Sequence, residues 1–325
     1  MKKIILDCFL FYNEKNLLYA RIDYLKDFVD VFCIVESAYT FTGKKKSFNA
    51  KNIIISKYGQ MFFQSRVVIF ENQEYIDAIN FKEIEQKYSN TMLLLELKSQ
   101  SIILDKDKYV WLNDCYQREL IAKVSKLCVE KNALDPNDVI ILVSDVDEIP
   151  SIEYLLSLGK TGDAVVFAEM QQFRYNISIV DSEKWIGTVK FGFNHFNSYS
   201  VNELRFATKR KSSRLKKYIV HENGGWHFTS FGSINEIKNK MNSWGHQELN
   251  TAINRYFLPF RLRYGLDIFG RDIAYMITKN NKLPIEITNN LQVSSEQVFF
   301  EPNSYHKLVH KIIRFVDRIT YRLTR

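Results

Sequence analysis

Apolar residues in the first half of the chain follow two alternating patterns. Unbroken apolar runs lie at residues 4–6, 31–35, 67–70 and 139–143. Between them, segments 16–28, 50–63 and 114–131 carry apolar side chains at helical spacing. Unbroken runs are typical of strands that are covered on both faces of a parallel sheet. The alternation predicts an α/β fold with a mostly parallel central sheet and right-handed crossovers.

The last of these predicted helices has a polar start and an apolar face. Asp114 precedes the apolar positions and is a candidate N-cap. The residues expected on the buried face are Leu120, Ile121, Val124 and Leu127. A short helix is expected over 151–158, after the break at Pro150.

The second half of the chain predicts added strands and helices. Shorter apolar segments at 164–167, 173–179 and 185–191 indicate strands, and a helix is expected near 234–244. Residues 72–110 fit no pattern clearly. Because no stretch rich in Gly, Pro or Ser marks a linker, we expect one domain over 1–300, divided near residue 160. A C-terminal segment over 301–325 follows it.

Composition narrows the class of protein. The 325 residues are 46% hydrophobic and carry a net charge of +8, which favours an anionic partner. The four cysteines are widely spaced, as expected for reduced, buried thiols in a cytosolic protein. No apolar run reaches the roughly 18 residues that cross a bilayer. Asp7 interrupts the first apolar run, so we interpret the start as a strand and expect a cytoplasmic protein.

Carboxylates follow the predicted strands. They are Asp7, Glu36, Glu71, Asp145 and Asp147. Open parallel sheets bind ligands at the carboxyl ends of their strands. Asp145 and Asp147 come directly after the most apolar run, where both can reach one metal ion across a tight turn. Mg²⁺ and Mn²⁺ prefer such oxygen ligands and can stabilise a diphosphate leaving group. The pattern therefore predicts a metal-assisted phosphate site.

The chain ends in a second clear pattern, over residues 306–325. The apolar positions at helical spacing are Leu308, Val309, Ile312, Ile313, Val316, Ile319 and Leu323. The basic residues of the opposite side are Lys307, Lys311, Arg314, Arg318, Arg322 and Arg325. This basic amphipathic helix suits an anionic membrane surface. It equally suits a terminal helix that packs on the domain with a solvated basic face.

Five blocks of sequence occur together over roughly residues 5 to 275. They are DCFLFYNE at 7–14, VES and TFTG within 35–43, Trp111 with YQR at 116–118, DVIILVSDVDEIP at 138–150 and GWHF at 225–228. In this order they resemble glycosyltransferase family 17. Its best-known members are the β-1,4-mannosyl-glycoprotein 4-β-N-acetylglucosaminyltransferases.

The resemblance implies an inverting transferase with a Rossmann-like, GT-A type fold. It implies a UDP-sugar donor, above all UDP-N-acetylglucosamine, and Mn²⁺ or Mg²⁺ as cofactor. Residues 1–160 would bind the nucleotide sugar, and residues 161–300 would form the acceptor side. The animal members carry a membrane anchor and a luminal stem, and we expect neither in this protein. We therefore expect a bacterial-type surface glycan or a lipid-linked glycan as acceptor, built at the cytoplasmic face of a membrane.

The resemblance and the strand ends together select candidate site residues. The metal ligands would be Asp145, Asp147 and His227. The donor site would include Asp7, Glu36, Arg118, Asp145, Trp226 and His227. An inverting transferase also needs a general base. The candidates for it, between which the sequence does not choose, are Glu148, Glu222, Glu248 and Asp272.

Structural roles remain open for most of these candidates. His227 and Trp226 also suit core positions, and Gly224 and Gly225 before them would allow a close approach of the backbone. Asp7 and Glu36 also suit exposed strand ends, and Arg118 a surface ion pair. The basic run at 209–217 would be a solvated face, a cover for the donor diphosphate or a surface that attracts an anionic acceptor.

Two other classes of protein use the same features. A metal-dependent phosphohydrolase or nucleotidyltransferase would use Asp145 and Asp147 without a sugar acceptor. A non-enzymatic protein that binds nucleic acid or anionic lipid would use the charge of +8 on one continuous basic face. The acidic strand ends argue against the second class, and neither class explains the five blocks. We therefore expect no nucleic-acid partner.

Overall fold

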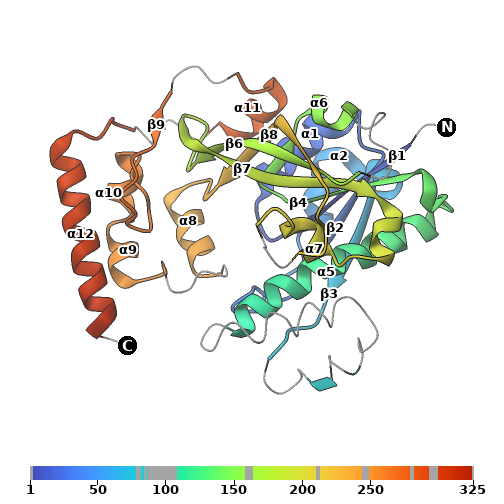
Figure 1. The fold of residues 1–325 in the computed structure, drawn as a ribbon, viewed down its shortest axis with the longest axis horizontal. Coiled ribbons are helices and arrows are strands. Elements are labelled where there is room, and N and C mark those ends of the chain that lie inside the picture. The colour runs from blue at the N-terminus through green and yellow to red at the C-terminus, as the bar shows by residue number, and fades with distance from the viewer. Residues whose placement is uncertain are drawn as a thin grey trace.

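The computed structural model describes residues 3–77, 82–83, 86, 108–157, 164–209, 213–243, 249–278, 282–292 and 299–323. Within these residues nine strands form one mixed sheet with helices on both faces (Figure 1). The strand order is β3-β2-β1-β4-β7-β6-β8-β5, and β9 pairs with β7. The predicted α/β class with a large central sheet is confirmed.

The first half of the sheet is parallel. Its strands are β1 (Ile4–Phe11), β2 (Val31–Ser37), β3 (Val67–Asn72) and β4 (Val139–Asp145). Each contains one of the four unbroken apolar runs. Helix α5 (Lys108–Lys131) covers one face, and helices α1 (Lys15–Leu25) and α2 (Ala50–Arg66) cover the other. Alternate residues of β1 and β2 point into two different apolar cores, one on each face of the sheet. Because both faces are buried, the apolar runs of these strands are not interrupted by polar residues.

The second half of the sheet is mainly antiparallel. Its strands are β5 (Glu148–Pro150), β6 (Val166–Arg174), β7 (Ile179–Gly192) and β8 (Ile219–Thr229). β7 lies antiparallel beside β4 and pairs with β6 in a long hairpin. Polar residues and two register shifts interrupt the pattern of this hairpin. The sequence therefore predicted three short strands where the structure has two long ones.

Two predictions for α5 are wrong. The helix begins at Lys108, so Asp114 lies inside it and pairs with Arg118 one turn later instead of capping the helix. Leu127 is 40% exposed, whereas Leu120, Ile121 and Val124 are buried as expected. Asp114 was mistaken for an N-cap because a polar residue before a run of apolar positions is typical of a helix start. In the structure this residue instead forms an i,i+4 ion pair within the helix.

The remaining elements complete the layers around the sheet. They are the 3-10 helices η1 (Pro136–Asp138) and η3 (Phe193–Asn197), the helices α6 (Ile152–Leu156), α7 (Val201–Phe206), α8 (Ile234–Met241), α9 (Ala252–Tyr256), α10 (Leu258–Arg263), α11 (Ile285–Leu291) and α12 (Ser304–Leu323), and strand β9 (Met276–Ile277). Helices α8 and α10 share a third apolar core with β7. Helix α12 lies outermost on that side, far from the parallel strands (Figure 1).

Two sequence-level expectations concern thiols and membrane spans. All four cysteines are free and buried, as the spacing predicted. None of the helices in the described part of the chain is long and apolar enough to cross a membrane.

Candidate active site

A cavity of about 540 Å³ opens at the carboxyl ends of the parallel strands. In the strand order, β2 lies on one side of β1 and β4 on the other, so the direction of winding changes between β1 and β4. Open α/β sheets bind ligands at such a switch point. The volume falls within the range of small-molecule sites, roughly 300–1,000 Å³. The predicted position of the site is thus occupied by a cavity of suitable size.

The two aspartates of the predicted metal site both line this cavity. Asp145 ends β4 with a side chain that is 40% exposed, and its oxygens lie 3.7 Å from Arg118 Nη2 and 3.8 Å from Arg205 Nη2. Burial raises the pKa of Asp145, but the charges of Arg118 and Arg205 outweigh this effect and the pKa falls below its usual range. Asp147 follows in the turn to β5, where Oδ2 accepts a hydrogen bond from Lys240 Nζ at 2.9 Å.

His227 lies beside Asp147, with Nε2 3.8 Å from Oδ1. The ring packs on Trp185 with centroids 4.8 Å apart, and Nδ1 is buried without a partner in the described part of the protein. Burial lowers the pKa of His227 despite the opposing charge of Asp147, so the imidazole is neutral near pH 7. A neutral imidazole is the form that binds metal ions.

Gly225 brings this histidine to the aspartate. The two glycines that precede Trp226 and His227 lie in the middle of β8. Gly225 has a φ of +144°, and a Cβ on this residue would lie 2.3 Å from the carbonyl oxygen of Ile149. The bare backbone lets β5 and β8 pair, which sets His227 opposite Glu148 in the register. The close backbone approach expected from the two glycines is therefore confirmed at Gly225.

Glu148, a candidate base, is fully buried and does not line the cavity. Trp185 Nε1 donates to Glu148 Oε1 at 2.5 Å, and Arg205 forms an ion pair with the same oxygen. The backbone N–H of Asp145 donates to Glu148 Oε2 at 3.3 Å. These contacts hold the turn that carries Asp145. Glu148 therefore supports the position of Asp145 but does not itself reach the cavity.

Asp7 and Glu36 are also internal. β1 continues to Phe11, so Asp7 lies within the strand and pairs through both oxygens with Arg21 at 2.7 and 2.5 Å. Glu36 accepts hydrogen bonds from the backbone N–H groups of Asn49 and Ala50 at 2.8 and 3.0 Å, where helix α2 starts. Neither side chain is exposed. The structure thus gives both residues structural partners and no access to the cavity.

The other predicted residues lie in different places. Arg118 lines the cavity and pairs with Asp114 at 2.8 Å. Trp226 points to the opposite face of β8 from His227 and packs edge-on against Tyr24. Two candidate bases lie outside the cavity: Glu222 is exposed on β8, and Asp272 is paired with Lys311 at 3.2 Å. The remaining one, Glu248, lies outside the described residues.

The model of glycosyltransferase family 17 matches residues 1–95 and 65–280 of this chain. The chain belongs to glycosyltransferase family 17. The matched segments contain every element that lines the cavity. Among the curated proteins, none matches this chain. Family membership makes this protein a glycosyltransferase.

Several residues at the transferase's site were not predicted from the sequence. The most informative are Trp185 and Lys240, which line the cavity, and the buried Arg205, which does not line it but places Nη2 3.8 Å from Asp145 Oδ2. Each comes from the second half of the chain and belongs to no motif, so only the net positive charge pointed to Arg205 and Lys240, and no signal pointed to Trp185. Lys209, from the basic run, places Nζ 3.2 Å from the centroid of the Trp185 ring. Elsewhere in that run Arg214 pairs with Glu203, and residues 210–212 are outside the described part.

The transferase's cavity offers two carboxylates and one imidazole as possible metal ligands, Asp145, Asp147 and His227. In the described residues, no three His, Cys, Asp or Glu side chains converge on a single point. The carboxylates nevertheless have oxygens that could bind an ion. Arg118 and Arg205 are too far from Asp145 for a hydrogen bond, and Lys240 binds only one oxygen of Asp147. Two carboxylates with one neutral imidazole in the same cavity form a donor set that suits Mn²⁺. The donor types therefore match a divalent ion, although the three side chains of the described structure do not converge on one point.

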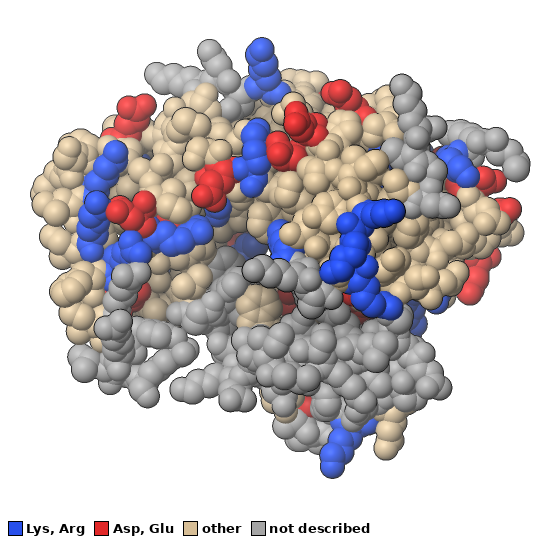
Figure 2. Space-filling model, in the orientation of Figure 1, with Lys and Arg blue, Asp and Glu red and all other residues tan. Residues whose placement is uncertain are grey.

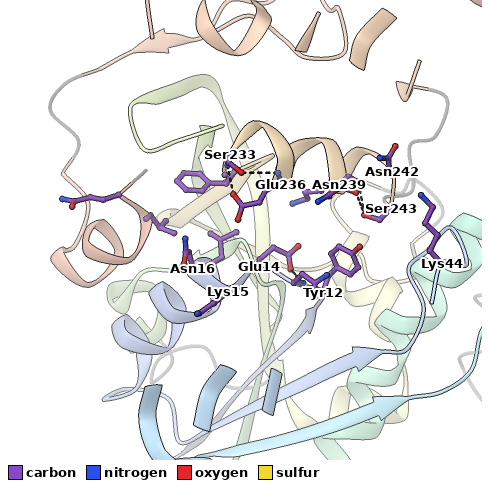
Figure 3. A pocket seen from close by; sticks show the side chains of 17 residues that line it. Tyr12, Glu14, Lys15, Asn16, Lys44, Ser233, Glu236, Asn239, Asn242 and Ser243 are labelled. Atoms are coloured by element: carbon purple, nitrogen blue, oxygen red, sulfur yellow. Dashed lines mark hydrogen bonds between the residues drawn. The ribbon is translucent and has the colours of Figure 1, made fainter. Parts of the chain in front are cut away.

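A second cavity of about 430 Å³ adjoins the first. Figure 3 shows it between the turn after β1, which carries Tyr12 and Glu14, and helix α8, which carries Glu236 and Asn239. The residues shared by the two cavities are Tyr12, Glu14, Lys240 and Ser243. A ligand group in one cavity can therefore approach a ligand group in the other.

Proposed function

We propose that this glycosyltransferase moves a sugar, N-acetylglucosamine, from a UDP-sugar to a hydroxyl group of a glycan, with inversion and in a GT-A type fold. The observation that carries the proposal is the meeting of Asp145, Asp147 and His227 in one cavity at the switch point of the sheet. The family match supplies the reaction class. The glycan would be a bacterial surface polysaccharide or its lipid-linked precursor.

The electrostatics of the cavity suit a diphosphate. Arg118 and Arg205 flank Asp145, and Lys240 flanks Asp147. Preorganised cations near a leaving group stabilise the charge that develops on it. Mn²⁺ or Mg²⁺ held by Asp145, Asp147 and His227 would add Lewis-acid stabilisation of the same diphosphate. The buried Glu148–Arg205 pair fixes these groups before the donor binds.

The main alternative is a phosphohydrolase that uses the same aspartates with water. The other alternative, a non-enzymatic protein that binds nucleic acid or anionic lipid through a continuous basic face, has less support. On the face in Figure 2, the described Lys and Arg side chains are interspersed with Asp and Glu and form no continuous basic surface. Incubating the protein with Mn²⁺ and a panel of UDP- and GDP-sugars, with and without glycosides, separates the classes. A transferase forms a new glycoside, whereas a phosphohydrolase releases phosphate at a rate that glycosides do not change.

We also propose that helix α12 attaches the enzyme to an anionic membrane. One side of the helix packs on the protein through His310 and Ile313. Another side leaves six apolar residues between 43% and 68% exposed: Tyr305, Leu308, Ile312, Phe315, Val316 and Ile319. We call these six residues the apolar stripe.

Charge favours a membrane as the occupant of the apolar stripe. Lys307 and Lys311 are exposed one turn apart on the same helix, beside the stripe. A helix that combines exposed apolar side chains with basic ones binds at the interface of anionic lipids. Packing on the domain thus explains one face of the helix, and the proposed membrane contact explains the other. A lipid-linked acceptor would be found at such a surface.

A further inference from the structure

The general base of the proposed reaction has to be a carboxylate or imidazole that reaches the acceptor hydroxyl. The carboxylates that line the first cavity in the described residues are Glu14, Asp114, Asp145 and Asp147. Asp114 is paired through both oxygens with Arg118, at 2.8 and 3.3 Å. The two later aspartates serve the donor side in the proposed function. Glu14 is the carboxylate that remains.

Glu14 is held in place and has a free oxygen. It lies in the turn between β1 and α1, where Oε2 accepts hydrogen bonds from the backbone N–H groups of Tyr12 and Asn13 at 3.2 and 3.0 Å. Oε1 accepts no hydrogen bond from the described residues. The side chain is half-buried and lies at the junction of the two cavities.

Lys240 links Glu14 to the donor side. Glu14 and Lys240 both line both cavities, and Lys240 Nζ donates to Asp147 Oδ2 at 2.9 Å. Glu14 therefore faces the same space as the cation that binds Asp147. A hydroxyl at the junction would lie between the donor site and the free oxygen of Glu14.

The second cavity has the chemistry of a carbohydrate site. Asn16, Asn239 and Asn242 present amide groups, and the rings of Tyr12 and Phe231 add aromatic surface. In Figure 3, Tyr12 and Glu14 extend from the turn toward helix α8, and Asn239 lies on that helix. Amide groups and aromatic rings match the hydroxyl groups and apolar faces of a sugar.

We propose that the second cavity binds the acceptor sugar and that Glu14 is the general base. The proposal rests on the proposed function and adds to it the acceptor site and a catalytic residue. The acceptor oxygen forms a bond to the anomeric carbon of the donor. The bond from that carbon to the diphosphate oxygen breaks, and its electron pair leaves with the diphosphate. The hydroxyl proton moves to Oε1 of Glu14.

The test uses Glu14→Gln, which keeps the acceptors for the two backbone N–H groups. Transfer of sugar from the active donor to methyl hexosides or to water is measured with Mn²⁺, together with UDP affinity and melting temperature. A general base contributes about 10²–10⁴ in rate. We expect kcat to fall at least about 100-fold, with UDP affinity within twofold of wild type. Glu222→Gln, an exposed carboxylate outside both cavities, should transfer like wild type.

Two further variants separate catalysis from support. In Glu14→Ala, added formate should restore part of the rate, because a small carboxylate can take the vacated position. Asn239→Ala should raise the KM for the methyl hexoside at least fivefold and leave the KM for the donor unchanged. A wild-type rate in Glu14→Gln, lost UDP binding in that variant, or a raised donor KM in Asn239→Ala would overturn the proposal. Wild-type protein that neither binds UDP nor transfers sugar would instead contradict the proposed function itself.

Discussion

Lys240 donates to Asp147 across 93 positions of sequence, with Nζ 2.9 Å from Oδ2. The contact joins helix α8 to the turn after β4 and closes one side of the cavity. It places a cation next to a proposed metal ligand, where the cation would also face the diphosphate of the proposed donor. The affinity of the site for a nucleotide should therefore depend on a residue that belongs to no motif.

Replacing Lys240 with Met tests this dependence. The variant keeps most of the side-chain length but removes the charge, so we expect UDP to bind on the order of ten times more weakly in Mn²⁺. A charged hydrogen bond is worth about 1.5–3 kcal/mol, which corresponds to that factor or more. Titration calorimetry measures it. Lys238→Met, on the same helix but outside both cavities, is the control, and equal losses in both variants would contradict a specific role.

His227→Ala should weaken donor binding more than folding. The imidazole places Nε2 3.8 Å from Asp147 Oδ1, in the same cavity, where both side chains can contact one ligand. UDP affinity with Mn²⁺ should drop about tenfold or more, by analogy with other losses around metal sites. A large fall in melting temperature with unchanged activity per folded molecule would show that His227 is a core residue instead.

Glu148→Gln should destabilise the protein. The substitution keeps the size and the contact with Trp185 but leaves Arg205, which is 1% exposed, without its buried carboxylate. Breaking a buried pair in this way costs about 3–5 kcal/mol. Denaturant unfolding should show the loss, with Glu153→Gln, at an exposed residue in the first turn of α6, as the control. Full stability with abolished transfer would favour the catalytic role that the sequence suggested.

The apolar stripe of α12 predicts salt-sensitive membrane binding. Replacing Ile312 and Phe315 together with Ala should release the protein from acidic liposomes, without lowering its melting temperature, because both side chains are exposed. Ile313→Ala is the matched control. Its side chain is 5% exposed, so it should cost about 2 kcal/mol of stability or more and spare binding. Co-sedimentation at low and high salt decides, and wild-type protein that never sediments would contradict the proposal.

The features predicted correctly depend on the local pattern of apolar and polar residues. The features that were missed depend on contacts between residues far apart in the sequence. The four parallel strands were found because two helical layers bury both of their faces. The cavity position and Asp145 followed from the carboxyl end of β4. Asp7 and Glu36 were placed at the site because their partners, Arg21 and the start of α2, cannot be recognised as partners before folding. For the same reason Lys240 was missed.

The central claim is a metal-dependent UDP-sugar site at Asp145 and Asp147. Titration calorimetry of UDP in Mn²⁺ and in EDTA, with wild type, Asp145→Ala and Asp147→Ala, tests it most directly. We expect binding by the wild type in Mn²⁺, loss of binding in EDTA, and loss in both variants while their folds remain intact. Wild-type binding that is unchanged by EDTA, or variants that bind UDP and Mn²⁺ as the wild type does, would contradict the claim.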